Sequence, residues 1–355
     1  MIDVHDVAYA LVGALGLPTA AQLETTALTS LDDCGSATAL ADICAGSWSA
    51  LERPGALATN VRLIERNREV DPSKWRRSRV GDGEIVHTEL KYDFIHRVVS
   101  AGASLVVGHI DEHNYALRRL CESLEYILMT RVWANCYIAS GTGSAFGSHS
   151  DNHDAIILQL AGRKRWTVHR REDTATVSGA MSKLSVLMTP GCCLAIPAGT
   201  DHEVEAIGEF SMHLTFGFVP VAGLADELAH ASVLLGVNAP SPESVDIRDY
   251  LAHLPDRRSG SSFPCAVSGS VGPDARIRWA SRLPPTITSV GEQILVVTRG
   301  RKFRFASRTG PVLRALAEGR EFSWGALLER STLAAEELRA FVKFCVANDI
   351  AICQG

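Results

Sequence analysis

The part of the sequence that most constrains the fold is residues 132–219, where short apolar runs alternate with turns containing Gly and Pro. The runs read, in order, "RVWANCYIA", "DAIILQLA", "KRWTVHR", "KLSVLMT", "CCLAIPA" and "SMHLTFGFV". Short strands in close succession favour an antiparallel sandwich or barrel over alternating βαβ units, which need a helix between strands. We therefore expect a mainly β core with flanking helices, in the α+β class.

The segments on either side of this core carry helical patterns. Residues 111–131 have apolar side chains at positions 116, 117, 120, 124, 127 and 128. This spacing predicts a helix that packs one face on the sheet and leaves its charges on the opposite face. The first 100 residues combine short helical patterns with polar turns. After the core, residues 221–254 favour helices, and a connector rich in Ser, Gly and Pro, "RRSGSSFPCAVSGSVGPDA", follows.

The last part of the chain predicts a small separate unit. A hairpin pattern, "EQILVVTRGRKFRFAS", precedes three short helical patterns and a closing apolar strand, "IAICQ". This order is typical of a winged-helix-like domain. We expect a core domain with an N-terminal helical extension over residues 1–220, a helical segment and linker over 221–290, and the winged-helix-like domain over 291–355.

Composition bears mainly on the compartment and the partners. The nine cysteines are odd in number and scattered, without a CxxC pair, which favours a reduced intracellular chain whose cysteines fill the core. The net charge of −5 gives no overall attraction to nucleic acid or to an anionic membrane. No apolar run approaches the roughly 18 residues of a membrane span, and Asp3 and Asp6 stand where a secretory signal would carry positive charge. We expect a cytoplasmic protein without a membrane partner.

A cluster of histidines and aspartates opens the stretch "SHSDNHDAIILQLAGRKRW", residues 148–166. If its first residues are extended, His149, Asp151 and His153 project from one face, but positions i and i+4 of a strand are about 13 Å apart. Because a metal ligand lies only about 2.0–2.2 Å from its ion, either His149 with Asp151 or Asp151 with His153 can share an ion. A third ligand must come from a remote strand, and His202 in "IPAGTDHEV" is the candidate. Two histidines and one carboxylate make the facial triad of non-haem iron(II) oxygenases.

Three segments together resemble a known family. "HSDNHDAIILQLAGRKRW", "MTPGCCLAIPAGTDHEV" and "SMHLTFGF" are similar to the cupin-type JmjC oxygenases, especially the ribosomal oxygenases, and the similarity spans roughly residues 103–219. The resemblance implies a double-stranded β-helix (cupin jelly-roll) JmjC domain. It also implies a helical segment that forms a homodimer and a C-terminal winged helix.

The resemblance also assigns the residues of the site. His149, Asp151 and His202 fall on the family's iron ligands. Lys164 falls on the basic residue that pairs with the distal carboxylate of 2-oxoglutarate. A carboxylate removed from water needs such a charge-assisted partner. The neighbouring Arg163 is the competing choice, but strand alternation sends it to the opposite face if a strand begins at the "GRKRW" turn.

Further positions follow from the same motifs. Asn135 in "WANCYI" matches a position that lines the co-substrate pocket, Tyr137 shares its face, and His213 in "SMHLTFGF" matches another motif position. The chain departs from some relatives at Gly217, where they have a small hydroxyl residue. It also has "GCC" where the family commonly has an acidic residue after the turn glycine. The first departure implies that one hydrogen bond to the co-substrate is absent or supplied by another residue, and the second affects the turn.

By this resemblance the protein is an enzyme, an Fe(II)- and 2-oxoglutarate-dependent dioxygenase. It would use O2 to hydroxylate a side chain, such as Arg or His, of a ribosomal protein or another protein or peptide, releasing succinate and CO2. One alternative is a hydroxylase that modifies a precursor peptide or small natural product. A cupin with a different metal role is disfavoured, because it would not need the cation at Lys164.

A second alternative is a nucleic-acid-binding regulator that acts through the tail. Residues 295–355 hold ten Lys and Arg against six acidic residues, and a basic patch supplies phosphate contacts. However, the helix expected to read DNA, "AAEELRAFVKFCVAND", carries two adjacent glutamates and much apolar surface. We therefore do not expect nucleic acid to be a partner.

Overall fold

The computed structural model describes residues 4–17, 60–80, 86–171, 181–219, 271–281 and 285–354, with residues 23, 26–30, 43, 45, 47 and 252. The chain divides into two compact units, Met1–Leu224 and Ala225–Gly355. Most of the helical segment predicted over residues 221–290 lies outside the described residues, as does the dimer surface expected there.

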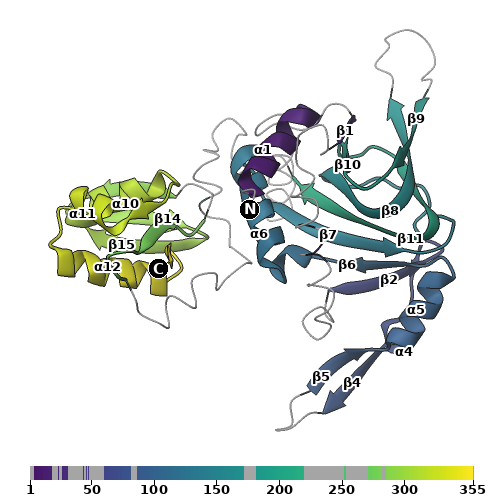
Figure 1. The fold of residues 1–355 in the computed structure, drawn as a ribbon, viewed down its shortest axis with the longest axis horizontal. Helices are drawn as coiled ribbons and strands as arrows, with labels where there is room; N and C mark the ends of the chain where they lie inside the picture. The colour runs from purple at the N-terminus through teal and green to yellow at the C-terminus, as the bar shows by residue number, and fades with distance from the viewer. Residues whose placement is uncertain are drawn as a thin grey trace, which may run out of the picture. The chain divides into compact units, whose positions relative to one another are not determined.

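The first unit combines one large sheet with several helices (Figure 1). Its elements, in chain order, are α1 (Val4–Leu15), β1 (Ala27–Ser30), β2 (Val61–Glu65), β3 (Arg68–Glu69), α4 (Pro72–Trp75), β4 (Arg76–Val80), β5 (Val86–Leu90), α5 (Tyr92–Ser100), β6 (Ser104–Val107), η2 (Ile110–Glu112), α6 (Tyr115–Leu128), β7 (Val132–Ala139), β8 (Asp154–Arg171), β9 (Met181–Met188), β10 (Cys192–Ile196) and β11 (His202–Phe218).

Nine strands form the sheet, in the order β1-β10-β8-β11-β7-β6-β2-β3, with β9 paired to β8. Every pairing in it is antiparallel. β4 and β5 make a separate two-stranded ribbon, which extends away from the sheet in Figure 1. The prediction of a mainly β core with helices is therefore confirmed. The prediction of helices and turns for the first 100 residues is wrong in part, since β1 to β5 lie there, in runs of five residues or fewer.

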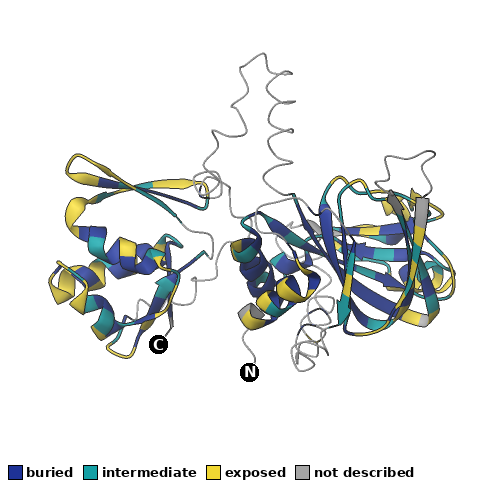
Figure 2. Ribbon diagram, turned by 90° about the horizontal axis from the view of Figure 1, so that it is seen from above, coloured by how far each residue is buried: buried dark blue, intermediate teal, exposed yellow. Residues whose placement is uncertain are grey.

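The two faces of the sheet have different neighbours, because side chains alternate along each strand. On β7 the even-numbered residues, from Val132 to Ile138, join an apolar core with α1 and α6. The odd-numbered residue Tyr137 faces a cavity on the opposite side. Figure 2 shows the strands of this unit largely in the colour of buried residues. The sheet thus separates a helix-covered core from a hollow face.

The charged residues of α6 differ from their prediction. The helix forms at the predicted place, but Arg119, Glu122 and Glu125 are buried rather than on a solvated face. Arg119 Nη1 lies 2.6 Å from Glu122 Oε2, so the two charges compensate each other. Because α1 also packs against α6, the helix is covered on more than its sheet-facing side.

β8 and β11 are long strands that change face partway along. The segments "DAIILQLA" and "KRWTVHR", which the sequence predicts as two strands, are one continuous strand without a turn. Its pairing with β11 is irregular between Ile207 and Ser211 and again between Met212 and His213. Each irregularity inserts an odd number of unpaired residues, so the side-chain alternation shifts by one position. As a result both halves of each strand direct side chains into the same cavity.

Gly162 lies at the first irregularity and has a φ of +62°. A Cβ atom at this position would lie 1.9 Å from the carbonyl oxygen of Phe210 and 2.8 Å from the Cα of Ser211. These are backbone atoms of β11, so no side-chain rotation could relieve the overlap. The crossing of the two strands therefore requires glycine.

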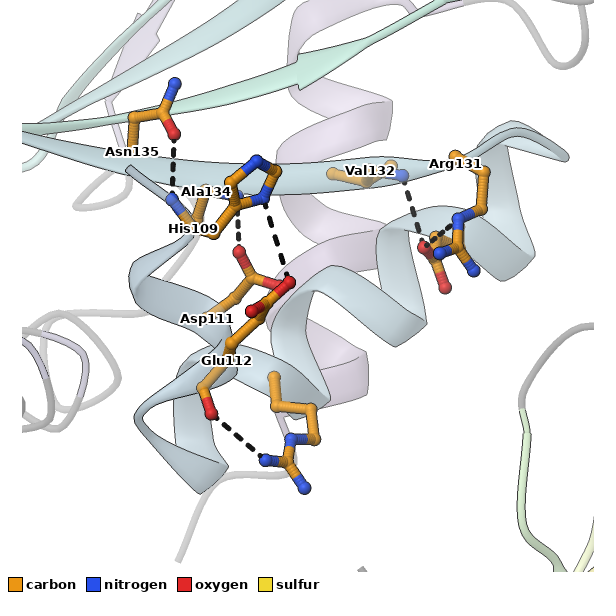
Figure 3. Close-up of polar contacts among 9 residues, drawn as sticks. His109, Asp111, Glu112, Arg131, Val132, Ala134 and Asn135 are labelled. Atoms are coloured by element: carbon orange, nitrogen blue, oxygen red, sulfur yellow. Dashed lines mark hydrogen bonds and ion pairs between the residues drawn. The ribbon is translucent and has the colours of Figure 1, made fainter. Parts of the chain in front are cut away.

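Carboxylates complete the hydrogen bonding of β7 where β6 does not reach it. β6 pairs only with the last four residues of β7. Beyond that point the N–H of Ala134 donates to Asp111 Oδ1 at 2.8 Å, and the N–H of Val132 donates to Glu125 Oε1 at 3.2 Å (Figure 3). Arg131 Nε lies 3.8 Å from the same Glu125 oxygen. The side chains of η2 and α6 thus take the place of a missing strand.

Replacing Asp111 with alanine is expected to lower the free energy of unfolding by about 1–3 kcal/mol, because it leaves the buried N–H of Ala134 without its acceptor. Denaturant unfolding of the purified variant measures the loss. Asp71→Ala is the control, since Asp71 is an exposed carboxylate that accepts one backbone N–H, from Ser73. A loss at Asp111 no larger than that at Asp71 would contradict the structural role given to the buried carboxylate.

The second unit contains β12 (Arg276–Trp279), β13 (Thr286–Val290), β14 (Gln293–Thr298), β15 (Arg301–Ala306), η4 (Ser307–Thr309), α10 (Gly310–Ala317), β16 (Phe322–Ser323), α11 (Trp324–Glu329), α12 (Ala335–Ala347) and β17 (Ala351–Gln354). Its strands form two three-stranded sheets, β16-β12-β17 and β13-β14-β15, around one apolar core. The predicted hairpin, three short helices and closing strand are all present.

Two compositional expectations can be compared with the described residues. Five of the six cysteines among them are buried, in agreement with a core role: Cys121, Cys136, Cys193, Cys345 and Cys353. Across the part of the chain that the structure describes, no helix combines the length and the apolar character that a bilayer crossing needs.

Candidate functional site

Three of the predicted residues meet at one end of the cavity. His149, Asp151 and His202 each offer a ligand atom, and these atoms lie within 4.8 Å of one another. His149 and His202 pair through both backbone hydrogen bonds, 3.0 and 2.8 Å long, and their rings are 4.4 Å apart between centroids. His202 Nε2 lies 3.9 Å from Asp151 Oδ2. The paired backbones therefore hold the two imidazoles side by side, with the carboxylate next to them.

The hydrogen bonds of the two imidazoles suit metal binding. His149 Nδ1 is 3.1 Å from the carbonyl oxygen of Gly147, and His202 Nδ1 is 3.0 Å from that of Thr200. Because a carbonyl only accepts, each Nδ1 carries the proton and each Nε2 keeps a free lone pair. A hydrogen bond from the ring nitrogen that does not bind the metal is the usual way in which proteins orient a metal-binding histidine. Two such nitrogens and one carboxylate oxygen fit a divalent ion such as Fe(II).

The local backbone separates His153 from this group. Residues 148–153 do not form a strand: His149 makes an isolated bridge to His202, and β8 begins only at Asp154. The ring of His153 packs instead against Trp133, with centroids 5.1 Å apart. Of the two ligand pairs that strand geometry leaves open, the structure brings His149 and Asp151 together with His202.

Lys164 lies in the same cavity and is buried, with 3% of its surface exposed, whereas Arg163 is exposed. Lys164 Nζ donates to the carbonyl oxygen of Tyr137 at 3.2 Å and lies 2.7 Å from His213 Nδ1. Among the described residues no carboxylate forms an ion pair with this ammonium group. Burial lowers the pKa of Lys164 to about 7. A buried cation of this kind is an anchor for an anion that enters the cavity.

Tyr137 and His213 line the cavity next to Lys164. Their rings stack with centroids 4.8 Å apart and an angle of 7° between planes. Burial, reinforced by the charge of Asp151, raises the pKa of Tyr137 to about 12. Burial, together with the charge of Lys164, holds the pKa of His213 well below its usual value. Both rings are therefore neutral at physiological pH, and His213 can accept a hydrogen bond from Lys164.

Asn135 uses its side chain to hold the backbone of a neighbouring segment. It lies on the same face of β7 as Tyr137, but its amide oxygen accepts the backbone N–H of His109 at 3.0 Å (Figure 3). Asn135 is not among the residues that line the cavity. Its side chain also hydrogen-bonds Tyr137, so it connects a residue of the cavity to the segment before η2.

The cavity has a volume of about 180 Å³ and includes residues that sequence reasoning missed. Trp166 stacks on the ring of His202 at 5.8 Å, and Thr215 lies two residues after His213 on the same strand. Arg62 and Ser104 come from β2 and β6, which the sequence did not predict as strands. Period-two alternation from His213 and Lys164 could have found Thr215 and Trp166. Nothing in the sequence signals the other two.

Arg62 belongs to a row of residues that crosses four strands. It is paired with Val106 of β6, which is paired with Tyr137 of β7, which is paired with His213 of β11. Three strand spacings of about 4.8 Å put the backbone of Arg62 about 14 Å from that of His213. Arg62 Nε forms an exposed ion pair with Glu69, 3.1 Å long. At one end of this row His213 contacts the buried Lys164, and at the other end lies the solvent-exposed Arg62.

The structure gives a steric explanation for the glycine at position 217. A Cβ atom at this position would lie 2.6 Å from two ring atoms of Trp133 and 2.8 Å from a ring atom of His153. The two rings occupy the space that a hydroxyl side chain would need. Glycine at position 217 therefore leaves the space that the packing of Trp133 against His153 requires.

Known proteins are similar to the central part of the chain. Residues 106–223 match the sequence model of the family described as JmjC domain. Ribosomal oxygenase 1 of Homo sapiens is 30% identical over 149 residues, which cover 37% of this chain and 23% of that protein. The bifunctional lysine-specific demethylase and histidyl-hydroxylase NO66 of Drosophila erecta is 27% identical over 127 residues, which cover 32% of this chain and 19% of that protein.

The matched region spans only about a fifth to a quarter of the length of these curated relatives. Among solved structures, YcfD, a ribosomal oxygenase from Escherichia coli, aligns with a TM-score of 0.46 and 15% identity, over 86% of this chain and 90% of that chain. The family match covers β7 to β11. Lys164 and His202 lie on these strands, and His149 and Asp151 lie in the segment before β8. Residues 106–223 are therefore similar to the JmjC domain family, and part of the chain is similar in sequence to ribosomal oxygenase 1.

Proposed function

We propose that the protein is an Fe(II)- and 2-oxoglutarate-dependent dioxygenase that hydroxylates a side chain of a protein or peptide. The observation that carries this proposal is the presence of His149, Asp151, His202 and a buried Lys164 around one cavity. The triad provides the three ligands of an iron centre that leaves positions open. Lys164 supplies the cation that a dicarboxylate needs at its far end.

The residues of the chain have distinct tasks in this proposal. His149, Asp151 and His202 hold Fe(II), which together with 2-oxoglutarate activates O2. Lys164 binds the distal carboxylate of 2-oxoglutarate and so fixes its orientation. Apolar residues of the cavity wall, such as Ala155, Ile157 and Ile196, keep water away from the reacting atoms.

We propose Arg or His side chains of a ribosomal protein as the substrate. The relatives support this class, since one is named a histidyl-hydroxylase and another a ribosomal oxygenase. A hydroxylase of a precursor peptide or small natural product is the alternative, because the same site could serve it. The exposed Arg62–Glu69 pair beside the cavity offers both a donor and an acceptor to a polypeptide.

Three further proposals concern the rest of the chain. Residues 291–355 are a winged-helix-like domain, which the sequence of hairpin, three helices and closing strand supports. The segment over residues 221–290 forms a homodimer. The location is the cytoplasm, which the scattered cysteines of the sequence, without a CxxC pair, support.

The test is an incubation of the enzyme with Fe(II), 2-oxoglutarate and ribosomal proteins or peptides. We expect succinate release that depends on iron, and a product that is heavier by one oxygen atom in mass spectrometry. Succinate with an oxidised peptide but no oxidised ribosomal protein would favour the alternative substrate class. Absence of succinate under all these conditions would rule out the oxygenase proposal.

Replacing Lys164 with methionine is expected to weaken 2-oxoglutarate binding roughly 30-fold or more, because removing one partner of a buried charge pair costs about 2–5 kcal/mol. Metal binding should not change, and thermal stability should be equal or higher, since the variant removes a buried charge. Arg163→Met is the matched control, as the adjacent side chain is exposed. Calorimetric titration with 2-oxoglutarate measures the affinities. Equal affinity in the Lys164 variant and the control would exclude Lys164 as the anchor.

The same titration should depend on pH, because burial lowers the pKa of Lys164 to about 7. A bound carboxylate raises this pKa, so above pH 7 binding must take up a proton. Affinity should be full below pH 7 and fall by up to about tenfold per pH unit above it. His213 stays neutral over this range, and the thiol of Cys136 is the other titratable group that acts on Lys164. Lys164→Arg should lack this dependence, since a guanidinium does not deprotonate.

A further inference from the structure

Asp154, three residues after Asp151, is completely buried and lies outside the His-Asp-His group. Each of its carboxylate oxygens accepts one backbone N–H. Oδ1 accepts from Ala198 and Oδ2 accepts from Leu23, both at 2.8 Å. A carboxylate with no exposure and two amide donors is fixed in place, because breaking either bond would leave a buried polar group unpaired. It ties the start of β8 to two segments that are distant in the sequence.

The first of these segments is the loop that precedes His202. In this loop the N–H of Gly199 donates to the carbonyl oxygen of Asp151 at 2.7 Å. The carbonyl oxygen of Thr200 lies 3.0 Å from His202 Nδ1. The N–H of Thr200 returns to the carbonyl oxygen of Pro197 at 3.2 Å, which closes the loop. The loop therefore holds the backbone of one candidate metal ligand and the ring of another.

We infer that Asp154 is the positioning residue of the metal centre. Its bond to Ala198 anchors the loop of residues 197–201 to β8, and the loop in turn fixes Asp151 through Gly199 and His202 through Thr200. Asp154 does not bind the metal. It sets the relative position of two ligands that come from different segments of the chain. This inference rests on the proposed metal-dependent function, but its test needs only the metal.

The test compares Co(II) binding by the full-length apoprotein and its Asp154→Asn variant. An asparagine side chain has one oxygen, so it can accept only one of the two N–H groups, and its NH2 group faces the other. Loss of an outer partner of metal ligands typically costs about 10–100-fold in metal affinity, and we expect a loss in that range. The visible absorption of bound Co(II) should also change, since it reports the arrangement of the ligands.

Asp111→Ala is the control, because it too removes a buried carboxylate that accepts a backbone N–H, on the helix-covered side of the sheet. It should lose stability yet bind Co(II) within about twofold of the wild type. Equal Co(II) affinity of Asp154→Asn and wild type, at a temperature where both are folded, would overturn the inference about Asp154 but not the proposed function. An equal loss in both variants would also overturn it. Failure of the wild type to bind Co(II) would instead count against the proposed function.

A second variant covers the case in which Asp154→Asn does not fold. Asp154→Glu keeps both carboxylate oxygens but moves them by one methylene, so the loop shifts without losing its acceptors. We expect weaker Co(II) binding and an altered spectrum. A folded glutamate variant with the affinity and spectrum of the wild type would contradict a positioning role for Asp154.

Discussion

Replacing Asp151 with alanine is expected to abolish the iron-dependent release of succinate. The change removes the only negatively charged donor of the His149–Asp151–His202 group and leaves two neutral imidazoles to hold a dication. Metal affinity should fall by more than roughly 100-fold, since losing even an outer partner of the ligands costs about 10–100-fold. Asp151 is partly exposed, with 36% of its side chain accessible, so the overall fold should survive. Metal titration and succinate assays measure the two effects.

Asp201→Ala is the matched control for this variant. Asp201 is exposed and precedes His202, so its removal subtracts the same charge near the site without removing a ligand atom. Its described hydrogen bond uses the backbone carbonyl oxygen, which accepts the N–H of His169. We expect succinate release close to that of the wild type. If both variants were inactive, charge rather than coordination would explain the loss, and the assignment of Asp151 as a ligand would fail.

Gly162→Ala is expected to lower the free energy of unfolding by about 4 kcal/mol or more, at the extreme end of single substitutions. Two costs add at this position. The φ of +62° is unfavourable for a residue with a Cβ atom, and that atom would overlap the backbone of Phe210 at 1.9 Å. The strand irregularity would have to rearrange, and the change of face that directs Lys164 inward would be lost with it. Thermal or denaturant unfolding of the variant measures the effect.

The variant Gly208→Ala distinguishes the conformational cost of a positive φ from the steric cost of the close strand approach. Gly208 lies in the same irregular part of β11 and has a φ of +109°, but a Cβ atom there would meet nothing within 4 Å. This variant should therefore lose only the conformational contribution, about 1–2 kcal/mol. If the two variants were destabilised equally, the close approach of the strands at Gly162 would not be a determinant of stability.

Local sequence patterns predicted the β core, because β7 to β11 are rich in apolar and β-branched residues and bounded by turn signals. They did not reveal β2 and β6, which are short runs of five and four residues. Pairing of β6 with β7, pairing of β2 with β6, and packing on the core decide their conformation, and these are tertiary effects. The continuity of β8 was missed for a related reason. Gly162 reads locally as a turn, whereas in the fold it marks a close crossing of two strands.

The sequence likewise predicted one part of the candidate site and not another. Spacing limited the ligand pair within residues 149–153, and the family pattern placed it with His202. The hydrogen bonds that orient the imidazoles come from backbone carbonyls of Gly147 and Thr200, which leave no trace in side-chain identity. Asp154 looked like one more polar residue of a polar stretch. Its burial and its bonds to Ala198 and to Leu23, which is 131 residues away in sequence, arise only in the folded chain.

The carboxylates at the end of β7 also bear on how the protein behaves at high concentration. A strand end with free N–H groups is a template to which a strand of another molecule can add, and this is how many sheets begin to aggregate. In β7 the N–H groups of Val132 and Ala134 are already taken by Glu125 and Asp111. An incoming strand would have to displace two fixed negative charges before it could pair. The buried carboxylates of Asp111 in η2 and Glu125 in α6 therefore oppose intermolecular strand pairing at this edge during folding and storage.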